Sequence, residues 1–281
     1  MATTDIYHIS GGLKGRRAVA FLGGAVDDGV QIDEFATDRV AANDTAGTFT
    51  AWINVPDKTG EYCILGCGDA SAIEYIYFGV KAGEIQAKCA RVGPNVAWDL
   101  ITVGANISPH IWHHIALVQD AVKPKIYIDG VEYSYAKGTL TETDISEATF
   151  WFDTCSLIDG AHIGTADSIA GDAALTLEYK GAISDVKYWN VALTDAQILD
   201  DFRNIDYTTN LISHWNFDGD YKDAVTANNN DGTAVGDIIL TNNYSEFTSR
   251  LRYTTGVPLV ADSVICFADE GTGHAVVIQA A

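Results

Sequence analysis

Short stretches in which apolar and polar residues alternate recur along most of the chain. The clearest is residues 47–54 (GTFTAWIN). Alternation with a period of two is the pattern of a half-buried strand. Similar patterns cover residues 72–80, 84–91, 111–120, 124–133, 148–153, 174–190, 211–218, 235–240, 262–268 and 274–279. Many short strands separated by turn signals predict an all-β sandwich rather than βαβ units.

Two local signals refine this pattern. Asp129-Gly130 lies inside residues 124–133 and predicts a hairpin turn, because both central residues of such a turn take positive φ. Residues 193–204 (LTDAQILDDFRN) instead show helical spacing. Thr194 can cap this helix, with Gln197 three residues later closing a capping box. The sequence therefore predicts one short surface helix on a β protein.

Composition and charge narrow the function classes. The chain has 281 residues, of which 47% are hydrophobic and 20% charged, as in a folded globular protein. Its formal net charge of -21 repels phosphate backbones, so nucleic acid is excluded as a partner. No stretch approaches the roughly 18 apolar residues that span a bilayer, so membrane insertion is not expected.

The five cysteines cannot all pair within one chain. Cys63 and Cys67 flank Ile-Leu-Gly, a spacing that fits neither a zinc knuckle nor a redox motif. Free cysteines in apolar strand patterns act as small hydrophobic residues, so we expect mostly reduced core cysteines. The apolar run after Arg16 and Arg17 is short, broken by glycine and followed by acids. It is a first core strand rather than a secretion signal.

Five segments, in order, resemble motifs of one known family. Residues 49–53 (FTAWI) resemble "FTxSAWI", 112–118 (WHHIALV) "WHHVALV", and 126–130 (IYIDG) "lYVDG". Residues 181–189 (GAISDVKYW) resemble "GxIDDVRIYN", and 192–198 (ALTDAQI) resemble "ALSDAEI". These are motifs of the laminin-G-like, concanavalin A-like lectin family. The resemblance implies a jelly roll, that is, a β-sandwich of two antiparallel sheets.

One further segment resembles the family but occupies a different position in the order of its motifs. Residues 211–236 (LISHWNFDGDYKDAVTANNNDGTAVG) resemble the segment that normally opens such a domain. We therefore predict a circularly permuted jelly roll over residues 1–244, in which residues 211–237 fill the sheet position left vacant at the start. The prediction requires Trp215 to lie inside the main sandwich. Residues 245–281 match no family motif and are predicted to be a C-terminal β extension or assembly arm.

One string has a catalytic spacing. Residues 142–147 (ETDISE) show the E-x-D-x-x-E pattern of jelly-roll endoglucanases that resemble laminarinases. Such a site needs the string on a substrate-facing strand. The string instead follows the hairpin at Asp129-Gly130, where the family pattern has a loop, and it lacks a neighbouring stacking tryptophan. We therefore expect no catalytic residues and no enzyme activity.

The sequence contains two candidate metal sites, a pair of histidines and a loop rich in aspartate and asparagine. His113 and His114 are adjacent in a predicted strand and point to opposite faces, so they cannot hold one ion together and are expected to be structural. Calcium prefers oxygen ligands from rim loops. The candidate ligands crowd one loop and are Asp218, Asp223, Asn228 and Asp231. Related lectin domains often carry calcium on the rim, but asparagine and aspartate are also favoured in turns.

A sugar-stacking platform requires an exposed aromatic ring. Trp52, Trp112, Trp189 and Trp215 lie within family strand motifs and are expected in the core. Trp98, close to Pro94 and Asn95 in an expected loop, is the best candidate for carbohydrate binding.

Three functions fit these observations. The first is a non-enzymatic structural or adhesion protein on a virion surface, such as a bacteriophage capsid decoration, head fibre or tail protein, with added glycan binding. The family's fold normally works outside cells, and assembly and lysis would bring a chain without a secretion signal to the exterior. Its partners would be other virion or surface proteins and host glycans, in a homo-oligomer or on a larger particle. The second is a calcium-dependent, extracellular lectin module, and the third is a glycoside hydrolase.

Overall fold

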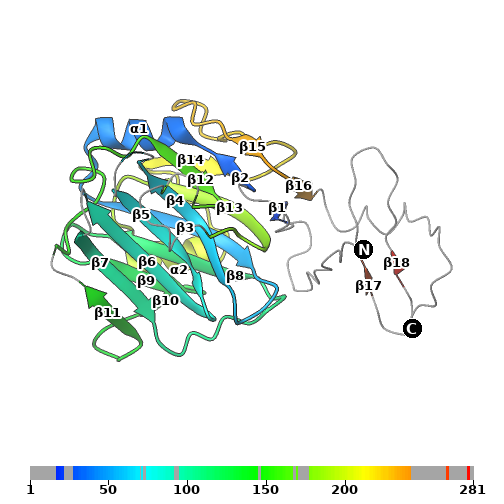
Figure 1. The fold of residues 1–281 in the computed structure, drawn as a ribbon, viewed down its shortest axis with the longest axis horizontal. Coiled ribbons are helices and arrows are strands. Elements are labelled where there is room, and N and C mark those ends of the chain that lie inside the picture. The colour runs from blue at the N-terminus through cyan, green and yellow to red at the C-terminus, as the bar shows by residue number, and fades with distance from the viewer. Residues whose placement is uncertain are drawn as a thin grey trace.

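The fold was analysed in a computed structural model of the chain (Figure 1). The structure describes residues 17–21, 28–69, 71, 74–91, 95–144, 147–166, 169, 177–241, 264–265 and 277–278. Within them, two eight-stranded antiparallel sheets stack into a sandwich, with two short helices at its surface. The predicted concanavalin-like β-sandwich is confirmed.

Sheet A forms one layer. Its strands run in the order β10 (Val131–Tyr133), β9 (Lys125–Ile128), β8 (His113–Gln119), β3 (Gly47–Asn54), β13 (Gly181–Trp189), β1 (Ala18–Phe21) and β16 (Ile238–Thr241). The eighth strand, β14 (Leu211–Trp215), pairs with β13. Strands β9 and β10 meet at the predicted hairpin, where Asp129 has φ 51° and Gly130 has φ 76°.

Sheet B forms the second layer. Its strands run in the order β11 (Leu140–Asp144), β7 (Asn95–Thr102), β6 (Glu84–Arg91), β5 (Tyr75–Lys81), β4 (Glu61–Gly68), β12 (Gly160–Ile163), β2 (Gly29–Gln31) and β15 (Thr233–Val235). The alternation pattern missed β2, β4, β7, β11 and β12, and it covers only the last residue of β15. Residues 148–153, predicted as a strand, form turns instead.

The sequence predicted one of the two helices and not the other. Helix α2 (Asp195–Phe202) lies within the predicted range, and Thr194 and Gln197 form the expected capping box. Helix α1 (Asp33–Ala42) was not predicted. Its N-cap residue, Ile32, makes no side-chain cap, so the usual signal for a helix start is missing. Neither described helix is long and apolar enough to cross a membrane.

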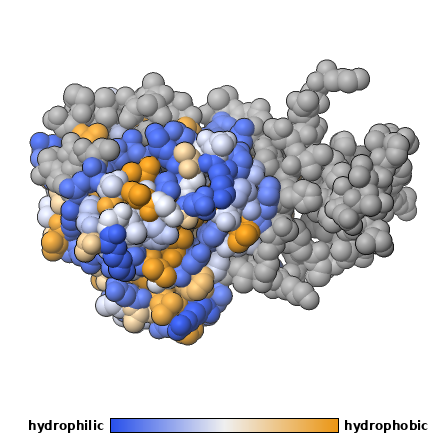
Figure 2. Space-filling model, turned by 90° about the horizontal axis from the view of Figure 1, so that it is seen from below, coloured by the Kyte–Doolittle hydropathy of each residue, from blue (hydrophilic) through white to orange (hydrophobic). Residues whose placement is uncertain are grey.

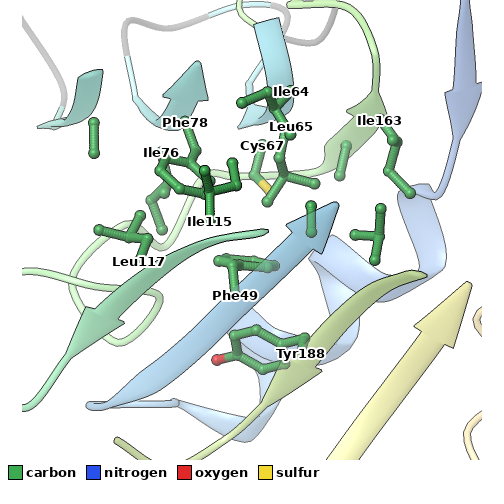
Figure 3. Close-up of a cluster of buried hydrophobic side chains, with 14 of the residues drawn as sticks. Phe49, Ile64, Leu65, Cys67, Ile76, Phe78, Ile115, Leu117, Ile163 and Tyr188 are labelled. Atoms are coloured by element: carbon green, nitrogen blue, oxygen red, sulfur yellow. The ribbon is translucent and has the colours of Figure 1, made fainter. Parts of the chain in front are cut away.

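The core lies between the sheets. In Figure 3, Phe49 and Tyr188 of sheet A face Cys67, Ile76 and other apolar side chains of sheet B. Aromatic rings concentrate where α1 closes the sandwich. Phe35 of α1 contacts four rings edge-on, with centroid distances of 5.1 to 6.0 Å; these are Phe49, Phe152, Tyr188 and Trp215. Such aromatic pairs stabilise a core beyond the area that they bury.

The late segment is part of this sandwich. Trp215 of β14 is fully buried in the core, and its Nε1 donates to the Asn230 carbonyl at 2.8 Å. Downstream, β15 pairs with β2 and β16 pairs with β1. The segment therefore adds a strand beside an N-terminal strand in each sheet, as the expected permutation requires. The predicted extension, residues 245–281, lies outside the described residues except for β17 (Val264–Ile265) and β18 (Val277–Ile278), which pair with each other.

Candidate functional site

The outer face of sheet B carries a group of interacting polar side chains. Ile85, Ala87 and Cys89 of β6 lie in the core, so the alternate residues of that strand point outward. Strand pairing places Lys88 opposite Asp99 of β7. Gln86 Nε2 donates to Asp99 Oδ1 at 2.9 Å, and Lys88 Nζ lies 3.5 Å from Asp99 Oδ2. We call Gln86, Lys88 and Asp99 the polar triad.

A covering segment borders the polar triad. Cys63, Tyr75 and Tyr77 on the outer face of sheet B pack against residues that follow β12, namely Ala166, Ile169 and Leu177. The close approach depends on Gly66, because a Cβ there would lie 3.1 Å from the Thr165 carbonyl oxygen. Two members of the polar triad stay partly accessible, with exposed fractions of 19% for the Lys88 side chain and 15% for that of Asp99, whereas Gln86 is buried.

Tyr77 is a fully buried residue next to the polar triad. Lys88 is its partner across the β5–β6 pairing. Burial, together with nearby acids that include Glu61 and Asp99, raises the pKa of Tyr77 well above its usual value. The phenol therefore stays protonated, and its hydroxyl donates to the Tyr62 carbonyl at 3.4 Å.

The polar triad can recognise neutral, hydroxyl-bearing groups. It combines an amide, an ammonium and a carboxylate, which together offer both hydrogen-bond donors and acceptors. The ion pair between Lys88 and Asp99 balances the two charges. A few fixed polar groups beside buried side chains are typical of small-molecule sites, where they orient the ligand.

The two glutamates of the acid string each pair with a cation. Glu142 Oε2 lies 2.8 Å from Lys123 Nζ, and Glu147 Oε1 lies 3.1 Å from Arg91 Nη2. In the pairing of β11 with β7, Glu142 lies opposite Leu100, whose side chain is in the core. Register partners share a face of the sheet, so Glu142 is not on the outward face that carries Asp99.

Asp223 and Asp231 hold the predicted calcium loop in place. Asp223 Oδ1 accepts hydrogen bonds from the backbone N–H groups of His214 and Val225, each at 2.8 Å. Asp231 Oδ1 accepts from the Asp223 backbone N–H at 3.0 Å. Burial raises the pKa of Asp223, although these hydrogen bonds oppose the shift. The two carboxylates thus accept hydrogen bonds from backbone N–H groups and fasten the loop to β14.

The other two predicted ligands are engaged elsewhere. Asn228 Nδ2 donates to the Ile212 carbonyl at 2.7 Å, and Asp218 pairs with Arg17. Among the residues that the structure describes, no group of three or more histidine, cysteine or carboxylate side chains is arranged to hold a metal ion. Calcium binding by the loop stays a prediction.

The expectation of an exposed Trp98 is wrong. Trp98 lies in β7, opposite Cys89, and is fully buried. Its ring stacks on Trp151 with centroids 6.3 Å apart, and its Nε1 donates to the Phe150 carbonyl at 3.1 Å. The strand already begins at Asn95, one of the two residues read as a turn signal, so the tryptophan belongs to the core rather than to a loop. A buried indole offers no face to a sugar.

The adjacent histidines are structural, as expected. His113 Nδ1 lies 2.8 Å from Asp129 Oδ2, in the hairpin between β9 and β10. On the opposite face, His114 Nε2 lies 2.9 Å from Asp201 Oδ2, and Lys187 Nζ lies 2.7 Å from Asp201 Oδ1. We call His114, Lys187 and Asp201 the Asp201 cluster. It fastens α2 to sheet A.

The electrostatics of the Asp201 cluster favour the charged carboxylate. Burial by itself would raise the pKa of Asp201. The hydrogen bond with His114 and the charge of Lys187 outweigh it, and they hold the pKa well below its usual value. The cluster therefore contains an ionised aspartate that is almost inaccessible to solvent.

The sequence interpretation missed the polar triad. Residues 84–91 (EIQAKCAR) do show Gln86 and Lys88 at alternate positions, which indicates a polar outer face. The contribution of Asp99 depends on the pairing of β6 with β7. That register includes an irregularity between Cys89 and Ala90, which no spacing in the sequence reveals.

Comparisons with known proteins agree with the fold. A family model for the concanavalin A-like lectin/glucanases superfamily matches residues 23–199. No curated protein sequence matches the chain. Among solved structures, a candidate carbohydrate-binding protein from Bacteroides ovatus has 19% identity and a TM-score of 0.52, with 83% of this chain and 61% of that chain covered.

Two further structures are similar. The K499G mutant of NanB sialidase from Streptococcus pneumoniae has 12% identity and a TM-score of 0.50, over 66% of this chain and 28% of that chain. The CBM40 of the Ruminococcus gnavus IT-sialidase, bound to α2,3-sialyllactose, has 12% identity and a TM-score of 0.49, over 62% and 91%. At these identities the likeness concerns the fold.

Proposed function

The chain belongs to the concanavalin A-like lectin/glucanases superfamily, and on that premise we propose that it is a non-enzymatic, glycan-binding protein displayed on a surface. The setting that we propose is a bacteriophage virion, where the protein serves as a capsid decoration, head fibre or tail protein. The observation that carries the binding function is the polar triad, in which the Lys88 ammonium and the Asp99 carboxylate lie partly exposed on the outer face of sheet B.

Neutral sugars suit the triad better than acidic ones. The chain carries a net charge of -21, which repels anionic ligands at long range. The cations near the triad are already neutralised, since Lys88 pairs with Asp99 and Arg91 pairs with Glu147. A sugar hydroxyl can donate to the carboxylate or accept from the amide without bringing a charge of its own.

The positions at which the chain enters and leaves the sandwich support display on a surface. Ala18 of β1 and Thr241 of β16 are register partners, so the segments before and after them attach at the same edge of sheet A. Strands β6 and β7, which carry the polar triad, lie at the opposite side of the sandwich (Figure 1). A domain held at one edge would leave the triad facing outward.

The visible surface suits a protein exposed to solvent. Figure 2 shows apolar residues scattered among hydrophilic ones over the described part of one face. The most exposed large apolar side chains are Val103, Ile111, Val122, Val131, Leu157 and Ile205, which lie in different segments of the chain. Single apolar residues of this kind are normal on a soluble surface.

A glycan array tests the binding function. The labelled protein should bind neutral glycans, and Asp99→Asn should weaken that binding about tenfold or more, because a hydrogen bond to a charged group contributes about 1.5–3 kcal/mol. Asp38→Asn is the matched control, since Asp38 is exposed on α1 in a different part of the chain. Circular dichroism must show that both variants are folded.

Two results would overturn the assignment to the polar triad. One is an array without any bound glycan. The other is equal binding by the parent protein, Asp99→Asn and Asp38→Asn.

Virion display is tested separately. Mass spectrometry of purified particles should find the chain in stoichiometric amounts, and light scattering should show a homo-oligomer. Glycan binding by a chain that is absent from particles would instead favour a lectin module of a secreted protein.

A further inference from the structure

Three cysteines lie together on the inner side of sheet B. Cys67 of β4 pairs with Ile76 of β5, and Ile76 pairs in turn with Cys89 of β6, so the two cysteines lie in one row facing the core. Cys155 approaches this row from the turns that follow β11. Its Sγ lies 3.4 Å from the Sγ of Cys89, 66 positions away in the sequence. These three cysteines are buried and reduced in the structure.

We propose that Cys89 and Cys155 form a disulfide bond when the chain meets a small-molecule disulfide oxidant such as oxidised glutathione. A disulfide has an S–S length of about 2.05 Å, so the two sulfurs need to approach by about 1.4 Å. Cys89 is held on both sides, by β5 and by β7. Cys155 lies in a turn, closed by a hydrogen bond from its N–H to the Trp151 carbonyl at 3.0 Å. The turn can supply the movement.

The reaction is a pair of thiol–disulfide exchanges. One cysteine thiolate attacks a sulfur of the oxidant, forms a mixed disulfide and releases the first thiol. The second cysteine thiolate attacks the protein sulfur of the mixed disulfide and releases the second thiol. Two electrons pass from the cysteine sulfurs to the oxidant, and the two cysteine protons are released to solvent or to the leaving thiolates.

Burial determines when the exchange takes place. Burial raises the pKa of the Cys89 thiol well above its usual value, and the hydrogen bond with Cys155 raises it further. The closed core therefore holds Cys89 in its thiol form and excludes the oxidant. The bond should form during folding, or when the turn that carries Cys155 opens. A chain that folds in a reducing compartment and is later displayed outside would be oxidised by the second route.

The test is refolding in an oxidising glutathione buffer, followed by peptide mapping without reduction. We expect a cross-linked peptide that contains Cys89 and Cys155, with the mass of two hydrogen atoms lost. A thiol titration should fall from the five cysteines of the sequence by two. The oxidised protein should melt roughly 5–10 °C higher than the reduced protein, because the bond constrains the unfolded chain.

Matched variants identify the pair. Cys63→Ala alters a cysteine on the outer face of sheet B and should leave the cross-link unchanged. Cys89→Ala should abolish both the cross-link and the effect of a reducing agent on the melting temperature. Five free thiols after refolding of the parent protein, or a map that joins Cys67 to Cys155, would overturn the proposal. The map of the parent protein decides the matter even if the Cys89→Ala variant does not fold.

Discussion

Replacing Asp201 by asparagine tests whether the Asp201 cluster holds α2 on the sandwich. The substitution keeps the size of the side chain and removes its charge. The carboxylate now contacts two donors, with His114 Nε2 at 2.9 Å and Lys187 Nζ at 2.7 Å. Asparagine has one acceptor oxygen in place of two, and its amide group would face a donor. One of the two donors therefore loses its partner.

The cost follows from the burial of the cluster. Removing one member of a buried ion pair destabilises a protein by about 3–5 kcal/mol, because the remaining charge is left uncompensated. The side chains of Asp201 and His114 have exposed fractions of 3% and 1%, whereas that of Lys187 is 12% exposed. Since Lys187 retains some contact with water, we expect the lower end, about 3 kcal/mol.

Urea unfolding followed by tryptophan fluorescence measures the effect. With a slope of about 3 kcal/mol/M for a chain of this size, the unfolding midpoint should fall by about 1 M. The matched control is Asp200→Asn, one position earlier on the same helix and half-exposed, which should change stability by less than about 0.5 kcal/mol. Equal midpoints for the parent protein and Asp201→Asn would refute the reasoning.

The pH dependence is a second readout of the same variant. The pKa of Asp201 is lowered in the folded protein, so its contribution is present above the unfolded value of about 3.9 and is lost as the pH falls toward the folded value. The difference in stability between the parent protein and Asp201→Asn should therefore be constant from about pH 7 to pH 5, and should shrink below about pH 4. A difference that grows on acidification would contradict the assigned charge state.

Two further predictions concern residues first selected from the sequence. Trp98→Ala should lower the free energy of unfolding by about 3–5 kcal/mol, as expected for a buried tryptophan, and thermal melting measures this. A variant with unchanged stability that has lost glycan binding would show that Trp98 is exposed after all. Calcium binding by the loop, as the sequence predicts, should raise the melting temperature, and a chelator or Asp223→Asn should abolish the rise. An unchanged melting temperature would contradict the calcium prediction and would agree with a loop whose carboxylates only accept hydrogen bonds from backbone N–H groups.

Much of the fold could be predicted because its signals are local or carried by family motifs. The hairpin at Asp129-Gly130 depends on the φ angles of two neighbouring residues, and the capping box of α2 on Thr194 and Gln197. Alternation placed β3 and β8 and put His113 and His114 on opposite faces. Each of these signals spans only a few residues, so neighbouring side chains and backbone groups decide it.

The features that the sequence failed to predict depend on long-range contacts rather than on local signals. Helix α1 lacks a side-chain N-cap, and it is held instead by Phe35 packing against rings from β3, β13 and β14. Trp98 follows a turn signal, yet in the core its ring stacks on Trp151 and its Nε1 donates to the Phe150 carbonyl. In both cases the stabilising contacts come from residues distant in the sequence, and tertiary packing overrides the local signal.

The sequence by itself determined that this protein is a sandwich of antiparallel strands from the concanavalin A-like superfamily. Periodicity and short motifs suffice for that, because they report which face of each strand is buried. Only the tertiary structure decided which side chains meet. The register between β6 and β7 joins Lys88 to Asp99, and a turn brings Cys155 to Cys89. The first contact depends on the register of two neighbouring strands, which an irregularity of one residue changes, and the second joins residues that are 66 positions apart in the chain.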